Sequence, residues 1–142
     1  MKLLACGINH ATADLSVREQ VCFSKDYLAT SLREMRRDTC TEEAIILSTC
    51  NRTEFYCING EAQNIINWLY QYKQLPKDSL RSHWYVYQQE QALRHLLRLA
   101  SGLDSRILGE PQILGQIKTA FSLANSFGTV GSHFNRLFQY IF

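Results

Sequence analysis

Strand-like and helical stretches alternate through the first 88 residues, and their order limits the possible folds more than any other feature. The runs that predict strands are residues 3–8, 44–48, 53–58 and 84–87. Apolar side chains repeat at helical spacing near residues 25–37, between the first two runs, and again from Ile65 to Tyr72, between the last two. The order βαββαβ predicts an α+β fold with a ferredoxin-like antiparallel sheet and two helices.

Polar residues that follow the first predicted strand have the spacing of helix caps. Ser16 and Glu19 match a capping box, in which a serine and a glutamate satisfy backbone N–H groups at the start of a helix. Ser24 precedes the helical stretch near residues 25–37. The sequence therefore predicts helix starts at Ser16 and at Ser24.

The second part of the chain carries only helical patterns. Glu110-Pro111 opens a helix that Gly128 ends, because proline suits the first helical position and glycine the position after the last. We expect a helical subdomain at about 89–142 after the ferredoxin-like part at about 1–88. A final apolar stripe at 134–142 packs either on this domain's own core or against further sequence, and the lack of a cap or polar tail favours the second.

The charges and cysteines exclude several classes of protein. Fifteen Lys and Arg against thirteen Asp and Glu leave a net charge of +2, too little for a typical nucleic-acid binder, so any RNA would bind locally. The five cysteines form no CxxC pair and follow no signal peptide, which indicates a reducing cytoplasm. No apolar run approaches the roughly 20 residues that span a membrane. Cys6 and His10 have no second ligand pair after them, so no metal site is expected.

Cys50 lies in the polar tetrapeptide Thr49-Cys50-Asn51-Arg52, in the predicted turn between the second and third strands. A thiol in such a turn is not automatically buried, and a cation such as Arg52 beside it would raise its thiolate fraction. Cys50 is therefore the candidate nucleophile. Each of the other four cysteines fits an inert buried residue better.

His95 and the segment after it form a second candidate region. His95 lies beside the apolar stripe of its helix, where a histidine more often packs at the edge of a core than transfers protons. The polar, glycine-bounded run 102–112 leads into a helix N-terminus, which suits an anion or an ester oxygen. The seven glycines form neither a phosphate-binding loop nor a dinucleotide fingerprint, so no element of this chain is expected to bind nicotinamide.

Three segments follow one another in a distinctive order. They are Gly7-Ile8-Asn9-His10 with Ser16-Val17-Arg18-Glu19, then Leu47-Ser48-Thr49-Cys50-Asn51-Arg52-Thr53-Glu54, then the stretch from His95 to Gln116. Together they resemble the N-terminal part of glutamyl-tRNA reductases, and the resemblance covers nearly the whole chain. Three motifs in one order make coincidence improbable.

The resemblance implies a reaction and a set of site residues. Family members use NADPH to reduce the glutamyl ester of tRNA(Glu) to glutamate-1-semialdehyde, the first step of the five-carbon route to 5-aminolevulinate, porphyrins and haem. Cys50 would form a thioester that hydride then reduces, and His95 matches a histidine that is important for activity. The implied substrate-binding residues are Thr49, Asn51, Arg52, Ser105, Glu110, Pro111, Gln112 and Gln116. The planar fork of Arg52 suits the substrate's side-chain carboxylate.

The resemblance also implies parts and partners outside this chain. Family members continue into a Rossmann-type NADPH domain and a dimerisation domain, so this chain alone is expected to perform only the acyl transfer. The expected partners are glutamyl-tRNA(Glu) and, for product transfer, glutamate-1-semialdehyde aminomutase, with a cytoplasmic homodimer as the full-length protein. Two alternatives stay open, a ferredoxin-like RNA-binding module and a regulatory interaction domain, both without catalysis.

Overall fold

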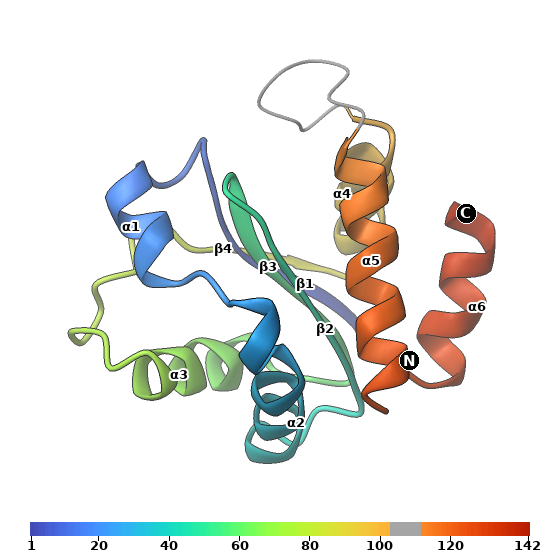
Figure 1. Cartoon of the computed structure of the whole chain (residues 1–142), viewed down its shortest axis with the longest axis horizontal. Coiled ribbons are helices and arrows are strands. Elements are labelled where there is room, and N and C mark those ends of the chain that lie inside the picture. Colours follow the sequence, from blue (N-terminus) through green and yellow to red (C-terminus); the bar gives the residue numbers. More distant parts are fainter. Residues whose placement is uncertain (103–111) are drawn as a thin grey trace.

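The computed structural model describes residues 1–102 and 112–142 (Figure 1). Four strands form one sheet in the order β2-β3-β1-β4, and every neighbouring pair is antiparallel. The strands are β1 (Leu3–Asn9), β2 (Glu43–Ser48), β3 (Arg52–Ile58) and β4 (Tyr85–Gln88). This is the ferredoxin-like strand order, so the predicted α+β fold is confirmed.

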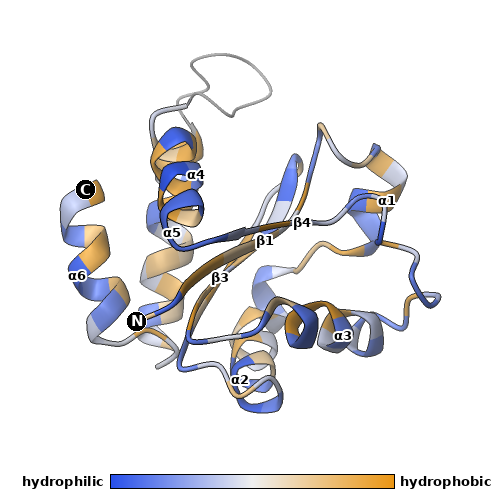
Figure 2. Ribbon diagram, turned by 180° about the vertical axis from the view of Figure 1, so that it is seen from behind, coloured by the Kyte–Doolittle hydropathy of each residue, from blue (hydrophilic) through white to orange (hydrophobic). Residues whose placement is uncertain are grey.

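Helices cover both faces of this sheet. They are α1 (Leu15–Gln20), the 3-10 turn η1 (Lys25–Tyr27), α2 (Leu28–Asp38), α3 (Ala62–Tyr72), α4 (Glu90–Ala100), α5 (Gln112–Ser126) and α6 (Ser132–Ile141). Helices α2 and α3 lie on one face, α4 and α5 lie on the other, and α6 lies beside α5 (Figure 1). Hydrophobic residues follow the central strands, whereas the outer helices carry hydrophobic and hydrophilic residues in bands (Figure 2).

Residues along β3 alternate between the two faces of the sheet. Phe55 points toward α2 and α3, and its ring centre lies 5.9 Å from that of Phe23, which in turn stacks on Trp68 of α3. Glu54 points the other way and contacts His95 of α4. Because helices cover both faces, all seven residues of β3 are buried, including its charged ones.

Helix α1 is capped by a residue other than the predicted one. Asp14 precedes the helix, and its Oδ1 accepts hydrogen bonds from the backbone N–H of Val17 at 3.1 Å and from the hydroxyl of Ser16 at 2.9 Å. The prediction that Ser16 caps this helix was therefore wrong. An aspartate caps as well as a serine, and Asp14 directly precedes the first residue of α1. Ser24 precedes η1, as predicted, but its side chain makes no capping hydrogen bond there.

Helix α6 is held by packing along one side and by a cap at its N-terminus. Phe134 and Phe138 are buried, and the ring of Phe138 stacks on Phe121 of α5 with the ring centres 4.6 Å apart. At the start of the helix, the carboxylate of Glu43 from β2 accepts hydrogen bonds from the backbone N–H groups of Gly131 (2.7 Å), His133 (3.1 Å) and Phe134 (3.0 Å). The buried side of the final apolar stripe therefore packs on this domain's own core, the first of the two alternatives above.

Candidate active site

Cys50 lies in an exposed turn that joins β2 to β3. The backbone N–H of Thr49 donates to the carbonyl of Arg52 at 2.8 Å, and the Thr49 hydroxyl accepts from the N–H of Asn51 at 3.1 Å. From α1, Nε of Arg18 donates to the carbonyl of Cys50 at 3.3 Å. The backbone of the turn is thus held from both ends and from α1, while the Cys50 residue stays exposed.

The other cysteines fall into two groups. Cys6 and Cys57 are buried in the sheet, and burial raises the pKa of both thiols, that of Cys57 to about 12. Cys22 and Cys40 are exposed, so the prediction that they are buried was wrong. Cys40 precedes β2 and Cys50 follows it, so these two thiols lie near opposite ends of one strand.

Two hollows meet at the Cys50 turn. The α5 hollow, with a volume of about 490 Å³, lies between β2 and α5. Its lining combines apolar side chains with the polar residues Lys25, Ser48, Thr49, Gln116 and Thr119. The α1 hollow consists of two adjoining depressions of about 370 and 380 Å³ that share Leu15, Arg18 and Cys50. Ser48 and Thr49 line the first of these depressions as well as the α5 hollow. A group bound at Cys50 therefore has space on both sides.

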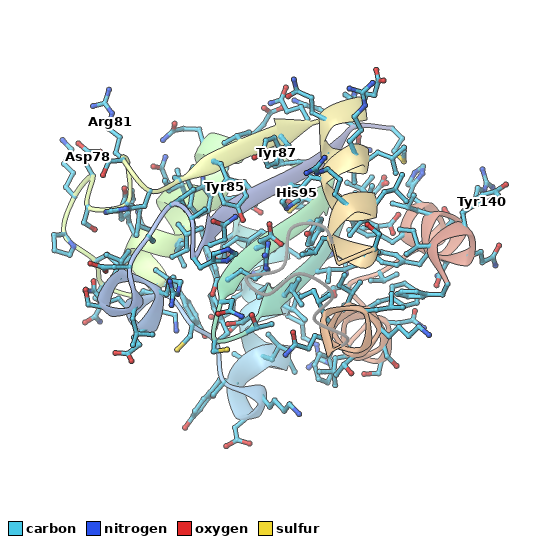
Figure 3. The ribbon with its side chains drawn as sticks, turned by 90° about the horizontal axis from the view of Figure 1, so that it is seen from above. Asp78, Arg81, Tyr85, Tyr87, His95 and Tyr140 are labelled. Atoms are coloured by element: carbon cyan, nitrogen blue, oxygen red, sulfur yellow. The ribbon has the colours of Figure 1, made fainter. Side chains whose placement is uncertain are left out.

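Beneath the helices on the α4 side, β3 carries a buried carboxylate. The oxygens of Glu54 accept hydrogen bonds from the hydroxyls of Tyr56 at 2.9 Å and Tyr85 at 2.5 Å, and Nε2 of His95 hydrogen-bonds to the same carboxylate. A guanidinium nitrogen of Arg52, which is 1% exposed, lies 3.6 Å from Glu54. Figure 3 shows the labelled Tyr85 and His95 side chains gathered over the sheet. We call these five residues the Glu54 network.

The charges in the Glu54 network decide its protonation. Burial opposes ionisation of Glu54, but the hydrogen bond and charge of His95, with the charge of Arg52 and the hydrogen bond of Tyr85, outweigh it and lower the pKa of Glu54. Burial also raises the pKa of Tyr85, which keeps its hydroxyl as a donor. Because an ionised carboxylate only accepts hydrogen bonds, Nε2 of His95 carries the proton in the bond to Glu54.

Gly7 of β1 makes this arrangement possible. In the strand register Gly7 lies opposite Glu54 on one side and Tyr85 on the other, and residues opposite one another point to the same face. The glycine therefore leaves a free path across β1 along which the Tyr85 hydroxyl reaches Glu54. A Cβ atom at Gly7 would lie 2.2 Å from the carbonyl oxygen of Thr53, closer than any side chain could be placed.

The structure places some of the predicted site residues in the two hollows. Thr49 and Gln116 line the α5 hollow together, although 67 positions separate them in the sequence. Cys50 and Asn51 line the α1 hollow.

The remaining predicted site residues lie elsewhere. Arg52 and His95 both contact Glu54 and belong to the buried network. Ser105, Glu110 and Pro111 lie outside the described residues, as does the side chain of Gln112, which begins α5.

Sequence reasoning missed Glu54, Tyr85 and Arg18 as site residues. Glu54 and Tyr85 lie in strands where apolar and polar residues alternate, which is also typical of a sheet with one solvated face. The sequence therefore did not indicate that these two residues are buried. The available signal was the number of helical stretches, which is large enough to cover both faces of the sheet. Arg18 contacts Cys50 across 32 residues of sequence, and local spacing cannot indicate such a contact.

The covered sheet bears on one alternative function. Ferredoxin-like RNA-binding modules stack bases on exposed aromatic residues of one sheet face. Nearly all residues of β1, β2 and β3 are buried, because α4 and α5 cover the face that α2 and α3 leave. The described part of the chain offers no such open face, which disfavours this alternative.

Comparisons with known proteins agree on one family. Residues 6–142 match the family described as "Glutamyl-tRNAGlu reductase, N-terminal domain". Glutamyl-tRNA reductases of Shewanella amazonensis and Stutzerimonas stutzeri are 49% and 50% identical to this chain over its whole length, which corresponds to 34% of each relative. The solved structure of the glutamyl-tRNA reductase from Methanopyrus kandleri superposes with a TM-score of 0.76 at 28% identity, over 98% of this chain and 32% of that one.

Among the helices within residues 1–102 and 112–142, none is both long and apolar enough to cross a bilayer.

Proposed function

This chain belongs to the glutamyl-tRNA reductase family, whose N-terminal domain it matches, and we propose that it performs the acyl-transfer half of that reaction. The substrate is glutamyl-tRNA(Glu), and the product is a glutamyl thioester on Cys50. The observation that carries the proposal is the position of Cys50, an exposed residue in a fixed turn at which two hollows meet.

The acyl transfer needs only a thiolate and the ester. The Cys50 sulfur attacks the ester carbon, so that an S–C bond forms and the C–O bond to the ribose breaks. The proton that leaves the thiol balances the proton that the ribose oxygen takes up, and tRNA departs with a free hydroxyl. An ester is exchanged for a thioester, and no oxidant or reductant takes part.

We propose that the glutamyl group extends from Cys50 into the α5 hollow. Thr49 and Gln116 supply polar groups on its wall, and Asn51 follows Cys50 in the same turn. Ser105, Glu110, Pro111 and Gln112 are further proposed substrate contacts. Arg52 is 1% exposed beside Glu54 and does not line the α5 hollow, so its direct contact with the substrate stays a prediction. Glutamate carries one amine and one free carboxylate, which amide, hydroxyl and guanidinium groups can hold.

His95 and Glu54 are proposed to support the Cys50 turn through Arg52. Nε2 of His95 hydrogen-bonds to the carboxylate of Glu54. The other oxygen of that carboxylate lies 3.6 Å from a guanidinium nitrogen of Arg52, the first residue of β3 after the Cys50 turn. This contact chain gives His95 a positioning role through Arg52. A direct catalytic role of His95 in proton transfer stays a prediction.

Reduction of the thioester is proposed for the longer members of the family and not for this chain. A dinucleotide-binding fold uses a parallel sheet and a glycine-rich turn, whereas the sheet described here is antiparallel throughout and the sequence has no GxGxxG. The described residues therefore do not fit NADPH. The chain spans about a third of the length of the curated relatives it matches, and we propose that the rest of such proteins holds the NADPH-binding Rossmann and dimerisation domains.

The wider setting is also a proposal. In a complete protein, reduction by NADPH would yield glutamate-1-semialdehyde for tetrapyrrole synthesis. The complete protein is proposed to be a cytoplasmic homodimer that passes its product to glutamate-1-semialdehyde aminomutase.

Intact mass spectrometry of the chain after mixing with glutamyl-tRNA tests the acyl transfer. The wild-type chain is expected to gain one glutamyl residue, and Cys50→Ser to gain none in the same time. Cys40→Ser is the matched control, because it removes an exposed thiol near the opposite end of β2 and should leave the adduct intact. An adduct on Cys50→Ser, or none on the wild-type chain, would refute the proposal.

A further inference from the structure

The α1 hollow holds no part of the glutamyl group in the proposal above, yet Cys50 lines both of its depressions. We propose that the α1 hollow binds the 3′-terminal nucleotide of the acylated tRNA, with Arg18 at its phosphate and Leu15 at its base. This inference rests on the acyl-transfer function proposed for Cys50.

The covalent connectivity of glutamyl-tRNA indicates which hollow holds the nucleotide and which holds the glutamyl group. The ribose oxygen is bonded directly to the carbon that the thiol attacks, so the terminal nucleoside must lie immediately beside Cys50. The glutamyl side-chain carboxylate is several bonds farther away and can reach a hollow that Cys50 itself does not line. Cys50 lines both depressions of the α1 hollow, whereas the α5 hollow is reached through Thr49.

The α1 hollow also has a suitable size. Its two depressions measure about 370 and 380 Å³, and each lies within the range of roughly 300–1,000 Å³ that is usual for small-molecule sites. One depression can hold a base and the adjoining one a ribose phosphate, with Leu15, Arg18 and Cys50 common to both.

Arg18 has the position and chemistry of a phosphate ligand. It is partly buried and anchored, since its guanidinium donates to the carbonyl of Ala13 at 2.9 Å and to that of Cys50 at 3.3 Å. A guanidinium has five N–H donors in a planar fork, so these two bonds leave donors for a phosphate. A cation held in place at the Cys50 turn also agrees with the small net charge of +2, which requires any RNA contact to be local.

The charges around the hollow separate the phosphate from the base. Glu19 lines only the depression that includes Cys22, and its carboxylate would repel a phosphate there. The other depression is lined by His10, Arg18 and Asn51 and has no acidic residue among its described lining. The phosphate therefore takes the depression of Asn51, and the base takes that of Cys22.

Leu15 provides an apolar surface for the base. It is the first residue of α1, it is 56% exposed, and it lines both depressions. Asp14 caps the helix directly before Leu15, which fixes the place of this side chain. Proteins that bind single-stranded RNA ends commonly combine a cation for the backbone with an apolar or aromatic face for the base.

Acylation rates with two donors test the proposal. One donor is glutamyl-tRNA, and the other is the α-benzyl thioester of glutamate, which offers the same acyl group without a nucleotide. The variants are Arg18→Gln and Leu15→Ser, with Arg81→Gln as a control that removes one exposed positive charge from the segment between α3 and β4 (Figure 3). Intact mass spectrometry follows the glutamyl adduct of each protein with time.

We expect Arg18→Gln to slow acylation by glutamyl-tRNA about 10- to 100-fold, since a charge-assisted phosphate contact is lost. Leu15→Ser is expected to slow it about 3- to 10-fold, and Arg81→Gln less than about twofold. With the benzyl thioester, Leu15→Ser and Arg81→Gln should match the wild-type chain. Arg18→Gln should slow this donor clearly less than it slows glutamyl-tRNA, because only the hydrogen bond to the Cys50 carbonyl is then lost.

The contrary outcomes are distinct. Equal slowing with both donors by Arg18→Gln would overturn the subsite, because Arg18 would then act only by holding the Cys50 turn. Unchanged rates with glutamyl-tRNA in both Arg18→Gln and Leu15→Ser would also overturn it. Both of these results leave the acyl-transfer function standing. A wild-type chain that reacts with neither donor would instead refute the acyl-transfer function itself.

Discussion

Individual thiols in this chain differ in chemistry because they differ in burial. Cys6 and Cys57 lie in the core of the sheet, where burial raises the pKa of each thiol and excludes reagents. We therefore expect iodoacetamide at neutral pH to modify Cys22, Cys40 and Cys50 in the folded chain, while the other two react only after unfolding. Peptide mapping by mass spectrometry measures each site. Rapid modification of Cys6 would contradict the described packing.

Sequence reasoning at the scale of the residue succeeded where a residue's own segment determines its environment. Cys50 follows a strand and lies among polar residues, so its position in an exposed turn was predictable. Glu54 lies only four residues farther on and is fully buried, because α4 covers it. Its role depends on His95, and no local pattern relates residues that are 41 positions apart.

Among the elements, β1 depends on a glycine. A methyl group at Gly7 would meet backbone atoms of β3, the Thr53 carbonyl oxygen at 2.2 Å and Cα of Glu54 at 2.8 Å, and backbone of a central strand cannot move aside. Gly7→Ala is therefore expected to lower the free energy of unfolding by about 3 kcal/mol, as measured by urea denaturation.

Gly115→Ala is the matched control for this prediction. Gly115 lies within α5 and a methyl group there would meet nothing within 4 Å, so alanine should raise the free energy of unfolding by about 0.5–1 kcal/mol. Equal effects of the two substitutions would contradict the close approach of β1 and β3 at Gly7.

Helix α6 depends on a carboxylate from β2. Glu43 accepts three backbone hydrogen bonds at the start of α6, and its negative charge lies at the positive end of the helix. Glu43→Ala is expected to destabilise the docked helix by about 2 kcal/mol, seen as faster hydrogen exchange of α6 amides. The exposed neighbour Glu42 contacts a side-chain nitrogen of His133 at 3.2 Å, and Glu42→Ala should change exchange little. Comparable effects of both variants would argue against the cap.

The order and type of the elements were predictable, but their caps were not. Runs of apolar residues gave all four strands because each strand is buried along its length or on one face. The start of α6 was not predictable, since its capping group comes from residue 43 rather than from the residues just before the helix. The cap of α1 was predicted wrongly because Asp14 and Ser16 are both of a residue type that caps helices. Only the observed hydrogen bonds show which of the two caps α1.

For the whole molecule, the Glu54 network makes stability depend on acidity. The folded pKa of Glu54 lies below the unfolded value of about 4.3, so the native state binds fewer protons near that pH. The stability that Glu54 contributes is fully present above about pH 4.3 and is lost as the pH falls through the lower folded pKa.

Glu54→Gln isolates this contribution. At neutral pH the variant should lose about 3 kcal/mol of unfolding free energy, because Arg52 and His95 stay buried without their charged partner. In urea denaturation across pH, wild type and variant should converge as the pH falls below about 4. Parallel curves over that range would show that Glu54 is not ionised in the folded chain.

The candidate site was only partly predictable at the scale of the molecule. The motif around Cys50 predicted the turn between β2 and β3. The resemblance predicted Gln116 as a site residue, and Gln116 lines the α5 hollow together with Thr49. The contribution of α1 was not predictable, because Arg18 reaches Cys50 only once the sheet has placed the β2–β3 turn beside that helix. Sites assembled from separate segments depend on the tertiary fold, which sequence patterns constrain weakly.

The cap that β2 provides for α6 also sets an order of events during protein synthesis. Glu43 lies nearly 90 residues before the helix that it caps. A chain that leaves the ribosome from its N-terminus has β1, β2 and β3 available long before residue 132 emerges. The finished sheet thus acts as a template, and the last helix assembles on a surface that already displays its first hydrogen-bond acceptor.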